Sequence, residues 1–286
     1  VTHTVTAAEV SAISTPITVT LPQSAISAAG EGAATITTTV TDSSGNVSPA
    51  ITTNVTIDTG TASATPASVS VPEATNGISS SEASDGVEVL VTLPSDAVAG
   101  DVITVSIDGG TPVTHTVTAA EVSAISTPIT VTLPQSAISA AGEGAATITT
   151  TVTDSSGNVS PAITTNVTID TVAPGTSPAT PASVSVPEAT NGINASEASD
   201  GVEVLVTLPS DAVAGDVITV SIDGGTPVTH TVTAAEVSAI STPITVTLPQ
   251  SAISAAGEGA ATITTTVTDS SGNVSPAITT NVTIDT

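Results

Sequence analysis

The segment Val152–Thr171, which reads VTDSSGNVSPAITTNVTIDT, decides the fold that we expect for this chain. It reads as the end of one strand, a polar turn built on Ser-Ser-Gly, and a complete second strand. Apolar and β-branched side chains alternate with polar ones from Ile163 to Ile169, which is the period of a half-buried strand. The segment then closes on a single carboxylate, Asp170. The pattern predicts a β-hairpin that ends each unit of the chain.

The chain is a tandem repeat, and this hairpin segment ends every copy. It occurs at Val40–Thr59, Val152–Thr171 and Val267–Thr286. The order of the repeats predicts three units, which we name by their place. They are a half module at 1–59, which is the C-terminal half of an immunoglobulin-like unit, a complete middle module at 60–171 and a complete last module at 172–286.

The copies are nearly identical. Residues 1–59 repeat residues 113–171 without change, and 64–171 differs from 179–286 only at Ser79/Asn194 and Ser80/Ala195. The first junction, between the half and middle modules, is shorter than the second by Val-Ala-Pro. Half a sandwich would expose strand edges and half of a core, so we expect the sequence to begin partway through a module of a longer chain.

Short strands and turns account for most of each module. In the last module we expect strands at Ala182–Val186, Val202–Leu208, Val217–Ile222, Val228–Thr233, Ile244–Leu248, Ala261–Thr268 and Ile278–Asp285. A long polar loop is expected at 187–201, and short helical or irregular connections at 234–242 and 251–259. Seven such strands in about 110 residues predict an all-β fold of tandem immunoglobulin-like β-sandwich modules linked end to end.

The composition excludes several classes of protein. The chain has no Lys, Arg, Cys, Met, Phe, Tyr or Trp, and its formal charge is −26. Without cations it is not expected to bind nucleic acid or anionic membranes, and without Cys it forms no disulfides. No apolar run approaches the ~20 residues of a membrane span. No nucleophile–base pattern appears, so we expect no enzymatic activity.

The acidic residues are expected to collect at the ends of the modules. Because successive strands run antiparallel, alternate loops lie at opposite poles of a sandwich. Carboxylates and amides of the first, third and fifth loops and of the last strand's end would therefore meet those of the next module's second, fourth and sixth loops. With no internal cation to neutralise them, we expect divalent ions to hold these poles together. Calcium, which takes six to eight oxygen ligands, fits such loops best.

The predicted calcium ligands are Asp and Asn or Glu residues of the loops and strand ends. In the half and middle modules they are Asp58, Glu73, Asn76, Glu82, Asp85, Asp96, Asp101, Asp108, Glu143, Asp154, Asn158 and Asp170. In the last module they are Glu188, Asn191, Glu197, Asp200, Asp211, Asp216, Asp223, Glu258, Asp269, Asn273 and Asp285. Zinc is disfavoured by the lack of Cys, and magnesium remains an alternative that prefers to keep its waters.

Simpler interpretations exist for each of these signals. Acidic residues gather in the loops of many β proteins because loops are wet, and the acidic loops here do not match the EF-hand spacing. His3, His115 and His230 could ligate a metal or act as a base. A packed, hydrogen-bonded His inside the sandwich or at a sheet edge is the interpretation that we favour. The Thr-rich outer faces are explained by β-propensity.

Three short patterns resemble a known family. They are NGINASEASDGVEV, TTTVTDSSGNVS and the strand end NVTIDTVAP, and together they cover every module. They resemble the tandem immunoglobulin-like repeats in the extender region of giant repeats-in-toxin adhesins, which include ice-binding and biofilm adhesins. The resemblance implies secretion by a type I system, an extracellular location on a bacterial surface and rigidification by calcium. It also implies that Asp170 and Asp269, with the acids of the first loop, are calcium ligands.

Two functional hypotheses follow. The first is a monomeric, elongated and non-catalytic spacer that projects a distal adhesive domain, with each module adding roughly 40 Å, since strands rise ~3.3 Å per residue. Its partners would be calcium ions and the neighbouring modules of the same chain. The alternative is a self-associating surface filament or surface-layer subunit, in which another chain completes the half module by strand addition.

Overall fold

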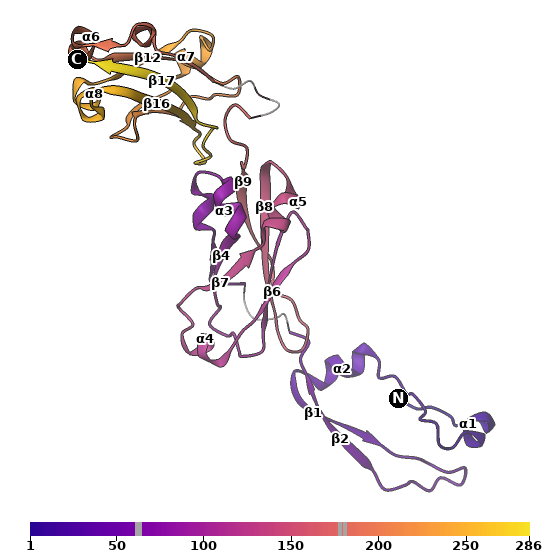
Figure 1. Ribbon diagram of the computed structural model, residues 1–286. Coiled ribbons are helices and arrows are strands. Elements are labelled where there is room, and N and C mark those ends of the chain that lie inside the picture. The colour runs from indigo at the N-terminus through magenta and orange to yellow at the C-terminus, as the bar shows by residue number, and fades with distance from the viewer. Residues whose placement is uncertain (61–64, 177–178, 180–181) are drawn as a thin grey trace.

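The structure is a computed structural model that describes residues 1–60, 65–176, 179 and 182–286. Parts of both predicted junctions, at 61–64, 177–178 and 180–181, lie outside the described residues. Figure 1 shows the half module, the middle module and the last module following one another along the chain, with neighbouring modules meeting end to end. Among the described residues, no helix has the length and apolar character needed to cross a membrane.

The middle module is a two-layered β-sandwich. Its strands are β3 (Ser68–Ser70), β4 (Val87–Thr92), β5 (Val102–Ile107), β6 (Val113–Thr116), β7 (Ile129–Leu133), β8 (Gly144–Thr153) and β9 (Ile163–Ile169). One antiparallel sheet has the order β3-β4-β7, and the other has the order β6-β5-β8-β9. Ile78 adds a parallel bridge to Ile169 at the end of β9. The predicted all-β, immunoglobulin-like sandwich is confirmed.

The last module repeats this architecture. Its strands are β10 (Ser183–Ser185), β11 (Ile193–Asn194), β12 (Val202–Thr207), β13 (Val217–Ile222), β14 (Val228–Thr231), β15 (Ile244–Leu248), β16 (Gly259–Thr268) and β17 (Ile278–Asp285). The bounds predicted for β13, β15 and β17 match, and the other four predicted strands deviate by no more than two residues at either end. β11 was not predicted, and it pairs in parallel with the end of β17.

The first loop of each module was predicted wrongly. Instead of a long polar loop, the last module has the 3-10 helix η2 (Pro187–Thr190), then β11, then the helix α6 (Ala195–Asp200). The middle module has η1 (Pro72–Thr75) and α3 (Ser80–Asp85) in the same places. These helices are short and polar, so they show no apolar period. A capping box starts α3 and α6, in which the N-cap side chain and a Glu three residues later exchange hydrogen bonds.

The predicted short connections are helical. They contain α4 (Ala119–Ser123) and α5 (Gln135–Ala141) in the middle module, and α7 (Ala234–Ser238) and α8 (Gln250–Ala256) in the last module. Between the two sheets, each complete module has its own aliphatic core, in which side chains such as Val89, Val105 and Ile148 are fully buried. Since the chain contains no aromatic residue, packing depends on Val, Ile, Leu and Ala alone.

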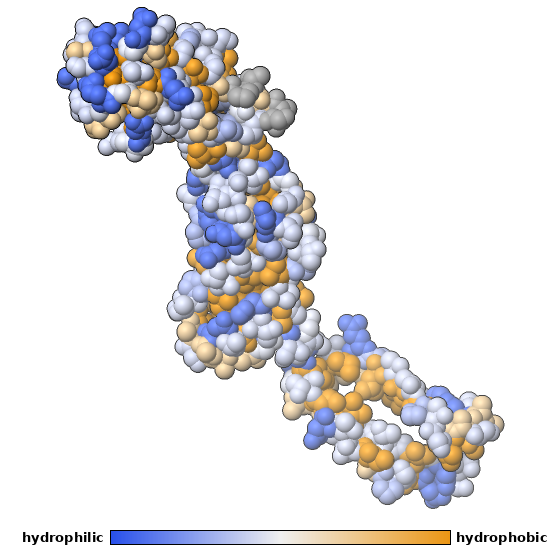
Figure 2. Space-filling model, viewed as in Figure 1, coloured by the Kyte–Doolittle hydropathy of each residue, from blue (hydrophilic) through white to orange (hydrophobic). Residues whose placement is uncertain are grey.

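The half module lacks such a core. It contains α1 (Ala7–Ser11), α2 (Gln23–Ala29), β1 (Gly32–Thr38) and β2 (Ile51–Ile57), with β1 and β2 as a two-stranded sheet. No residue of 1–60, all of which the structure describes, is buried. Figure 2 shows apolar residues lining the open ring that this part of the chain forms.

Candidate metal sites at the module poles

The poles that the strand order predicts to be neighbours are in contact at the second junction. The turn between β16 and β17 lies against the first loop of the middle module and against the end of β9. Asn273 Oδ1 accepts a hydrogen bond of 2.8 Å from the Ser80 N–H, and Asn273 Nδ2 donates one of 2.7 Å to the Asp170 carbonyl. This contact consists of direct hydrogen bonds, which the prediction of poles held only by divalent ions did not include.

Four carboxylates come together at this junction. They belong to Asp170 at the end of β9, Asp211 and Asp216 in the loop between β12 and β13, and Asp269 in the turn after β16. Burial raises the pKa of Asp216, and the charges of Asp269, Asp211 and Asp170 raise it further, although a hydrogen bond from the Val213 N–H acts in the opposite direction. All four residues were predicted ligands. Because Asp170 belongs to the middle module, its effect on the pKa of Asp216 is a repulsion that acts across the junction.

Asp216 is the most unusual member of this group. Its side chain is 1% exposed, and only its Oδ2 is hydrogen-bonded, to the Val213 N–H at 2.9 Å. Its Oδ1 is buried and has no hydrogen-bond partner among the described residues. A buried carboxylate oxygen without a partner is costly in a protein interior, so this atom marks a place where a cation would be stabilising.

The first residues of the linker, 171–175, are held to both modules. The Thr171 N–H and hydroxyl donate to the Glu143 carboxylate of the middle module. Four residues later, the Gly175 N–H donates to the two carboxylate oxygens of Asp211 in the last module, at 2.9 and 3.1 Å. Pro174 and Gly175 are buried. The linker is therefore part of the junction rather than a free tether.

A second group of carboxylates lies within each complete module. In the middle module it comprises Glu73 on η1, Glu82 and Asp85 on α3, and Glu88 on β4. Burial raises the pKa of Glu73, and the three neighbouring carboxylates raise it further, while a 2.8 Å hydrogen bond from the Glu88 N–H lowers it. Glu88 was not among the predicted ligands, because it lies on a strand.

The equivalent group in the last module has the same pattern. Glu188 Oε1 accepts a long hydrogen bond of 3.4 Å from the Glu203 N–H. Glu188 Oε2 is buried without a hydrogen-bond partner in the part of the chain that the structure describes. Asp200 ends α6, as Asp85 ends α3. This arrangement repeats in both complete modules.

Several predicted ligands are held by hydrogen bonds inside their own module. Glu82 and Glu197 complete the capping boxes of α3 and α6. Glu143 and Glu258 accept from the Thr residues that end their modules, Thr171 and Thr286. Asp108 and Asp223 have positive φ and accept from the N–H groups of Thr147 and Thr262 at 2.8 and 2.7 Å. The hydrogen bonds of these six acceptors position loops, and they leave the metal assignments of the acceptors as predictions.

The Asp and Asn of the hairpin turn are paired with one another. Asp154 Oδ1 accepts from the N–H groups of Ser156 and Asn158 at 2.9 Å, and Asp154 Oδ2 accepts from Asn158 Nδ2 at 2.8 Å. The Asn158 side chain, with smaller backbone contributions, lowers the pKa of Asp154 despite some desolvation. Asp269 and Asn273 are paired in the same way. These residues therefore shape the turn whether or not a metal is bound.

The remaining predicted ligands lie at the poles and in the loops beside them. Asp101 is fully buried and accepts from the Val98 N–H at 3.0 Å, and Asp96 lies in the same loop. Asp58 accepts from Asn158 Nδ2 at 3.2 Å across the first junction. Asn76 donates to the Ser270 carbonyl across the second. Asn191 ends η2, and Asp285 ends β17.

The side chains alone do not complete a metal site. Within the described residues, no group of three or more His, Cys, Asp or Glu side chains is arranged to hold an ion. Calcium also accepts carbonyl and amide oxygens, and the second junction presents the Asp170, Asn76 and Ser270 carbonyls beside the four carboxylates. The donor set is entirely oxygen, which fits calcium and not zinc.

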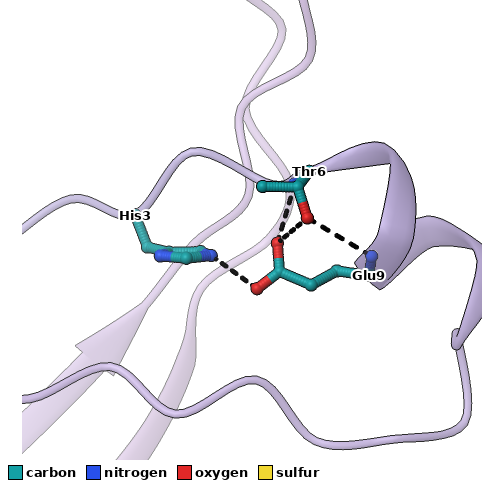
Figure 3. A network of polar contacts seen from close by, with 3 residues as sticks. All are labelled: His3, Thr6 and Glu9. Carbon is teal, nitrogen blue, oxygen red and sulfur yellow. Dashed lines mark hydrogen bonds and ion pairs between the residues drawn. The ribbon is translucent and has the colours of Figure 1, made fainter.

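The histidines have a structural partner. Figure 3 shows His3, Thr6 and Glu9, where His3 Nε2 lies 2.9 Å from Glu9 Oε1 and Glu9 Oε2 completes the capping box of Thr6. The same contact joins His115 to Glu121 and His230 to Glu236 at 2.9 Å. β14, which carries His230, is an edge strand. The favoured interpretation of a hydrogen-bonded His at a sheet edge is confirmed for His115 and His230, whereas His3 makes the same contact but lies on no strand.

Sequence reasoning missed three residues of the second junction, namely Gly77, Ser80 and Ser271. The Ser271 hydroxyl lies 2.9 Å from Asp170 Oδ2 and 3.1 Å from the Asn76 carbonyl. A signal for this surface was present, because the only two differences between the complete modules fall at residues 79 and 80, on its edge. Their position marks a surface that adjoins something outside the module.

The comparisons with known proteins were made with both sequence and structure. No protein-family model matches the chain, and no curated protein matches it. Among solved structures, it is similar to a Ca2+-stabilized adhesin that helps an Antarctic bacterium bind ice, with 29% identity, 90% of this chain and 57% of that chain covered, and a TM-score of 0.42. It is also similar to a 1.5-MDa bacterial ice-binding adhesin studied for host cell surface retention, with 26% identity, coverages of 91% and 76%, and a TM-score of 0.40.

A third similar structure is that of fibronectin(III)-like modules of Clostridium thermocellum CbhA, with 14% identity, coverages of 76% and 94%, and a TM-score of 0.41. This chain therefore spans 57% of the length of the first adhesin. Both adhesins are of the kind that the sequence resembles.

Proposed function

We propose that this chain is a non-catalytic spacer of a bacterial cell-surface adhesin, built of β-sandwich modules whose junctions are stiffened by calcium. The division at Thr59 and Thr171 is part of this proposal. The adhesive domain would lie elsewhere in a longer protein, and the resemblance favours type I secretion. Near-identical copies support a spacer, since length and stiffness come from repetition, whereas a binding site needs only one copy.

The observation that carries the proposal is the buried, unpartnered Oδ1 of Asp216 beside three further carboxylates, in a chain without Lys or Arg. No side chain of this protein except His can supply a positive charge there. A divalent cation from outside would satisfy Asp216 and relieve the repulsion among Asp170, Asp211 and Asp269 at once. The group around Glu73, and that around Glu188, would be secondary sites of the same kind.

Calcium would act by linkage. An ion that binds only the folded junction stabilises it by RT ln(1 + [Ca]/Kd), which is about 2.7 kcal/mol at a hundredfold excess over Kd. Since Asp170 belongs to the middle module and Asp211, Asp216 and Asp269 to the last, an ion held by both sets would also restrict bending between them. Stiffness and heat resistance would then rise together.

The proposal is tested by calcium titration of the whole chain. We expect calcium, added after chelation, to raise the melting temperature by several degrees and to narrow the interdomain distances seen by small-angle X-ray scattering. Asp216→Asn should lose most of this response at the second junction, while Asp42→Asn, in the exposed turn of the half module, should keep it. A wild-type melting curve and scattering profile that are indifferent to calcium would exclude calcium as the stiffening ion.

Light scattering on the same samples distinguishes this spacer from the alternative, a self-associating filament. A spacer should stay monomeric and elongated over a wide range of concentrations in light scattering coupled to size exclusion. Growth of the mass with concentration, suppressed by an added peptide that spans residues 65–112, would favour strand addition at the half module instead.

A further inference from the structure

The hairpin turn of the last module makes a tight contact with the middle module through direct hydrogen bonds. Besides the two hydrogen bonds of Asn273 described above, Asn76 Nδ2 donates to the Ser270 carbonyl at 3.1 Å. The Ser271 hydroxyl has two acceptors within reach, Asp170 Oδ2 and the Asn76 carbonyl. Donors and acceptors thus cross the junction in both directions, and the donors are neutral amides and a hydroxyl.

This contact is closely packed. Ser271 is 6% exposed and Asn273 is 5% exposed, although both lie in a polar surface turn. A Cβ atom at Gly77 would lie 2.6 Å from Ser271 Oγ, which is closer than any real Cβ approaches a neighbour. Gly77 also has a φ of +104°. The close approach of the two modules therefore depends on the absence of a side chain at Gly77.

The three copies of the turn show that its own shape is not what decides the contact. Asp42, Asp154 and Asp269 make the same hydrogen bonds within their turns, to the residues two and four positions later. Asn46 is exposed, Asn158 is half-buried with one contact to Asp58, and Asn273 is buried with two contacts across its junction. The turn is preformed, and the surface that faces it differs.

The facing surface comes from both halves of a module. Asn76, Gly77 and Ser80 belong to the first loop, and Asp170 belongs to the last strand's end. The half module contains Asp58, the equivalent of Asp170, but none of the first loop, which explains its single contact. Because the Ser80 contact uses the backbone N–H, the change to Ala195 in the last module keeps this donor.

We propose that the turn Asp269–Asn273 is a metal-independent latch that fixes the orientation of one module on the one before it, with Asn273 as the positioning residue. The latch recognises the first loop and strand end of a module of this same type. Its neutral donors satisfy the Asp170 carboxylate and carbonyl without an ion, and a linker whose first residues are held to both modules keeps the two surfaces at high effective concentration. This inference goes beyond the calcium proposal, because it predicts an ordered junction in the presence of a chelator.

Two pairs of matched variants test it. Gly77→Ala and Gly192→Ala impose the same strain of positive φ, but a Cβ at Gly192 would approach only its own module, at 3.3 Å from the Thr283 carbonyl. Asn273→Asp removes the amide donor and adds a charge beside Asp170, whereas Asn46→Asp makes the same change in an exposed turn. The members of each pair differ mainly in what they do to the second junction.

The readout is the distance between spin labels on the two modules, measured by pulsed electron paramagnetic resonance in excess chelator. The chain has no cysteine, so Thr164→Cys and Thr279→Cys, both exposed, give a single labelled pair. We expect a narrow distribution in the parent chain, in Gly192→Ala and in Asn46→Asp. Gly77→Ala and Asn273→Asp should broaden it at least twofold, while the circular dichroism of the modules stays unchanged.

Two results would overturn the latch. The first is that, in chelator, the distance distributions of Gly77→Ala and of Asn273→Asp are as narrow as that of the parent chain. The other is a parent distribution that is broad in chelator and narrows only when calcium is added, an outcome that would leave the calcium proposal standing. If the parent chain has a narrow distance distribution in chelator and gains no stability from calcium, the latch would be supported and the calcium proposal would be contradicted.

Discussion

The half module and the second half of the middle module have the same 59 residues and different structures. In both, the capped helices α1 and α4, the helices α2 and α5 and a terminal hairpin form. Only the middle module forms β6 and β7, and residues 1–4 and 17–21 of the half module are not strands. Ile36 is 36% exposed, and its equivalent Ile148 is fully buried.

This difference shows which elements depend only on residues close in sequence and which depend on contacts with the rest of the module. A capping box and a tight turn need only residues close in sequence, so these elements form in both copies. β7 pairs with β4, and β6 pairs with β5, and both partners lie in the first half of a module. Without those partners the backbone groups of these segments have no ladder to join. The first half of a module is thus a template for strands that the second half cannot form alone.

The largest effect that this comparison predicts is in proteolysis. Thermolysin, which cuts beside aliphatic residues, should cleave within 17–21 at least ~100-fold faster than within 129–133, because each 1.4 kcal/mol of opening free energy changes the rate tenfold. The sequence is the same at both sites, so the intrinsic cleavage rate cancels. Fragment masses distinguish the two cuts. Equal rates would mean that β7 is no better protected than its unpaired copy.

A core substitution should sharpen the same contrast. Ile148→Ala removes a fully buried side chain between the two sheets and should cost about 2–5 kcal/mol of the middle module's unfolding free energy. Ile36→Ala changes the identical position in the half module and should leave the two unfolding transitions within ~0.5 kcal/mol of the parent. Chemical denaturation followed by circular dichroism measures both. A comparable loss from Ile36→Ala would show that the half module is cooperatively folded.

These results also explain how far sequence reasoning reaches here. The alternation of Val, Ile and Thr was enough to place β13, β15 and β17, because period and turn residues are local signals. The helix α6 was missed because its six residues, ASEASD, are too few and too polar to show an apolar period, although Asn194 and Glu197 carried the capping signal. Antiparallel order correctly placed the first loop and the end of β9 against the turn after β16 at the second junction.

Ligand assignments could not be made at the same level. Whether a carboxylate is free for a metal depends on its hydrogen bonds, and the sequence does not show that Glu82 and Glu143 are engaged by backbone N–H groups. Asp216 is buried inside its own module, as Asp101 is in the middle module, but the closeness of Gly77 to Ser271 arises only when two modules meet. This closeness follows from tertiary contacts between residues about two hundred positions apart.

The two junctions should respond differently to removal of a buried charge. Because burial raises the pKa of Asp216, the folded state favours its protonated form, and the stability this provides at low pH is lost as the pH rises through the raised pKa. Asp216→Asn should therefore raise the free energy of unfolding in chelator at neutral pH by about 1–3 kcal/mol. The gain should disappear as the pH falls below the unfolded-state pKa.

The control for this prediction is Asp101→Asn, the same change beside the half module. Asp216 is repelled by Asp170, which belongs to a complete module, so the gain at Asp216 should be the larger of the two. In the presence of calcium, Asp216→Asn should instead gain less stability than Asp101→Asn, because it loses a ligand of the ion at the second junction. If Asp216→Asn lowered the free energy of unfolding in chelator at neutral pH, the buried charge of Asp216 would not be destabilising, and the prediction would be wrong.

The smallest effect concerns a cap that has the same geometry in both copies. Thr118→Ala removes the N-cap of α4, whose neighbours Val122 and Ile125 pack on the core, and should cost the middle module about 0.5–2 kcal/mol. Thr6→Ala should unwind α1 without shifting either melting transition, since Val10 and Ile13 are 61% and 87% exposed. Calorimetry and the NMR shifts of the two helices measure this.

Acid should act on the middle-module cap in the same direction as Thr118→Ala. Hydrogen bonds from the Thr118 backbone and side chain, and then His115, lower the pKa of Glu121. The stability that this provides is present above the unfolded-state pKa and is lost as the pH falls through the lowered folded pKa. Glu121→Gln should remove that part of the acid sensitivity. If Thr6→Ala lowered a melting temperature as much as Thr118→Ala does, α1 would have to be packed on a core, and the two copies would differ less than their exposures indicate.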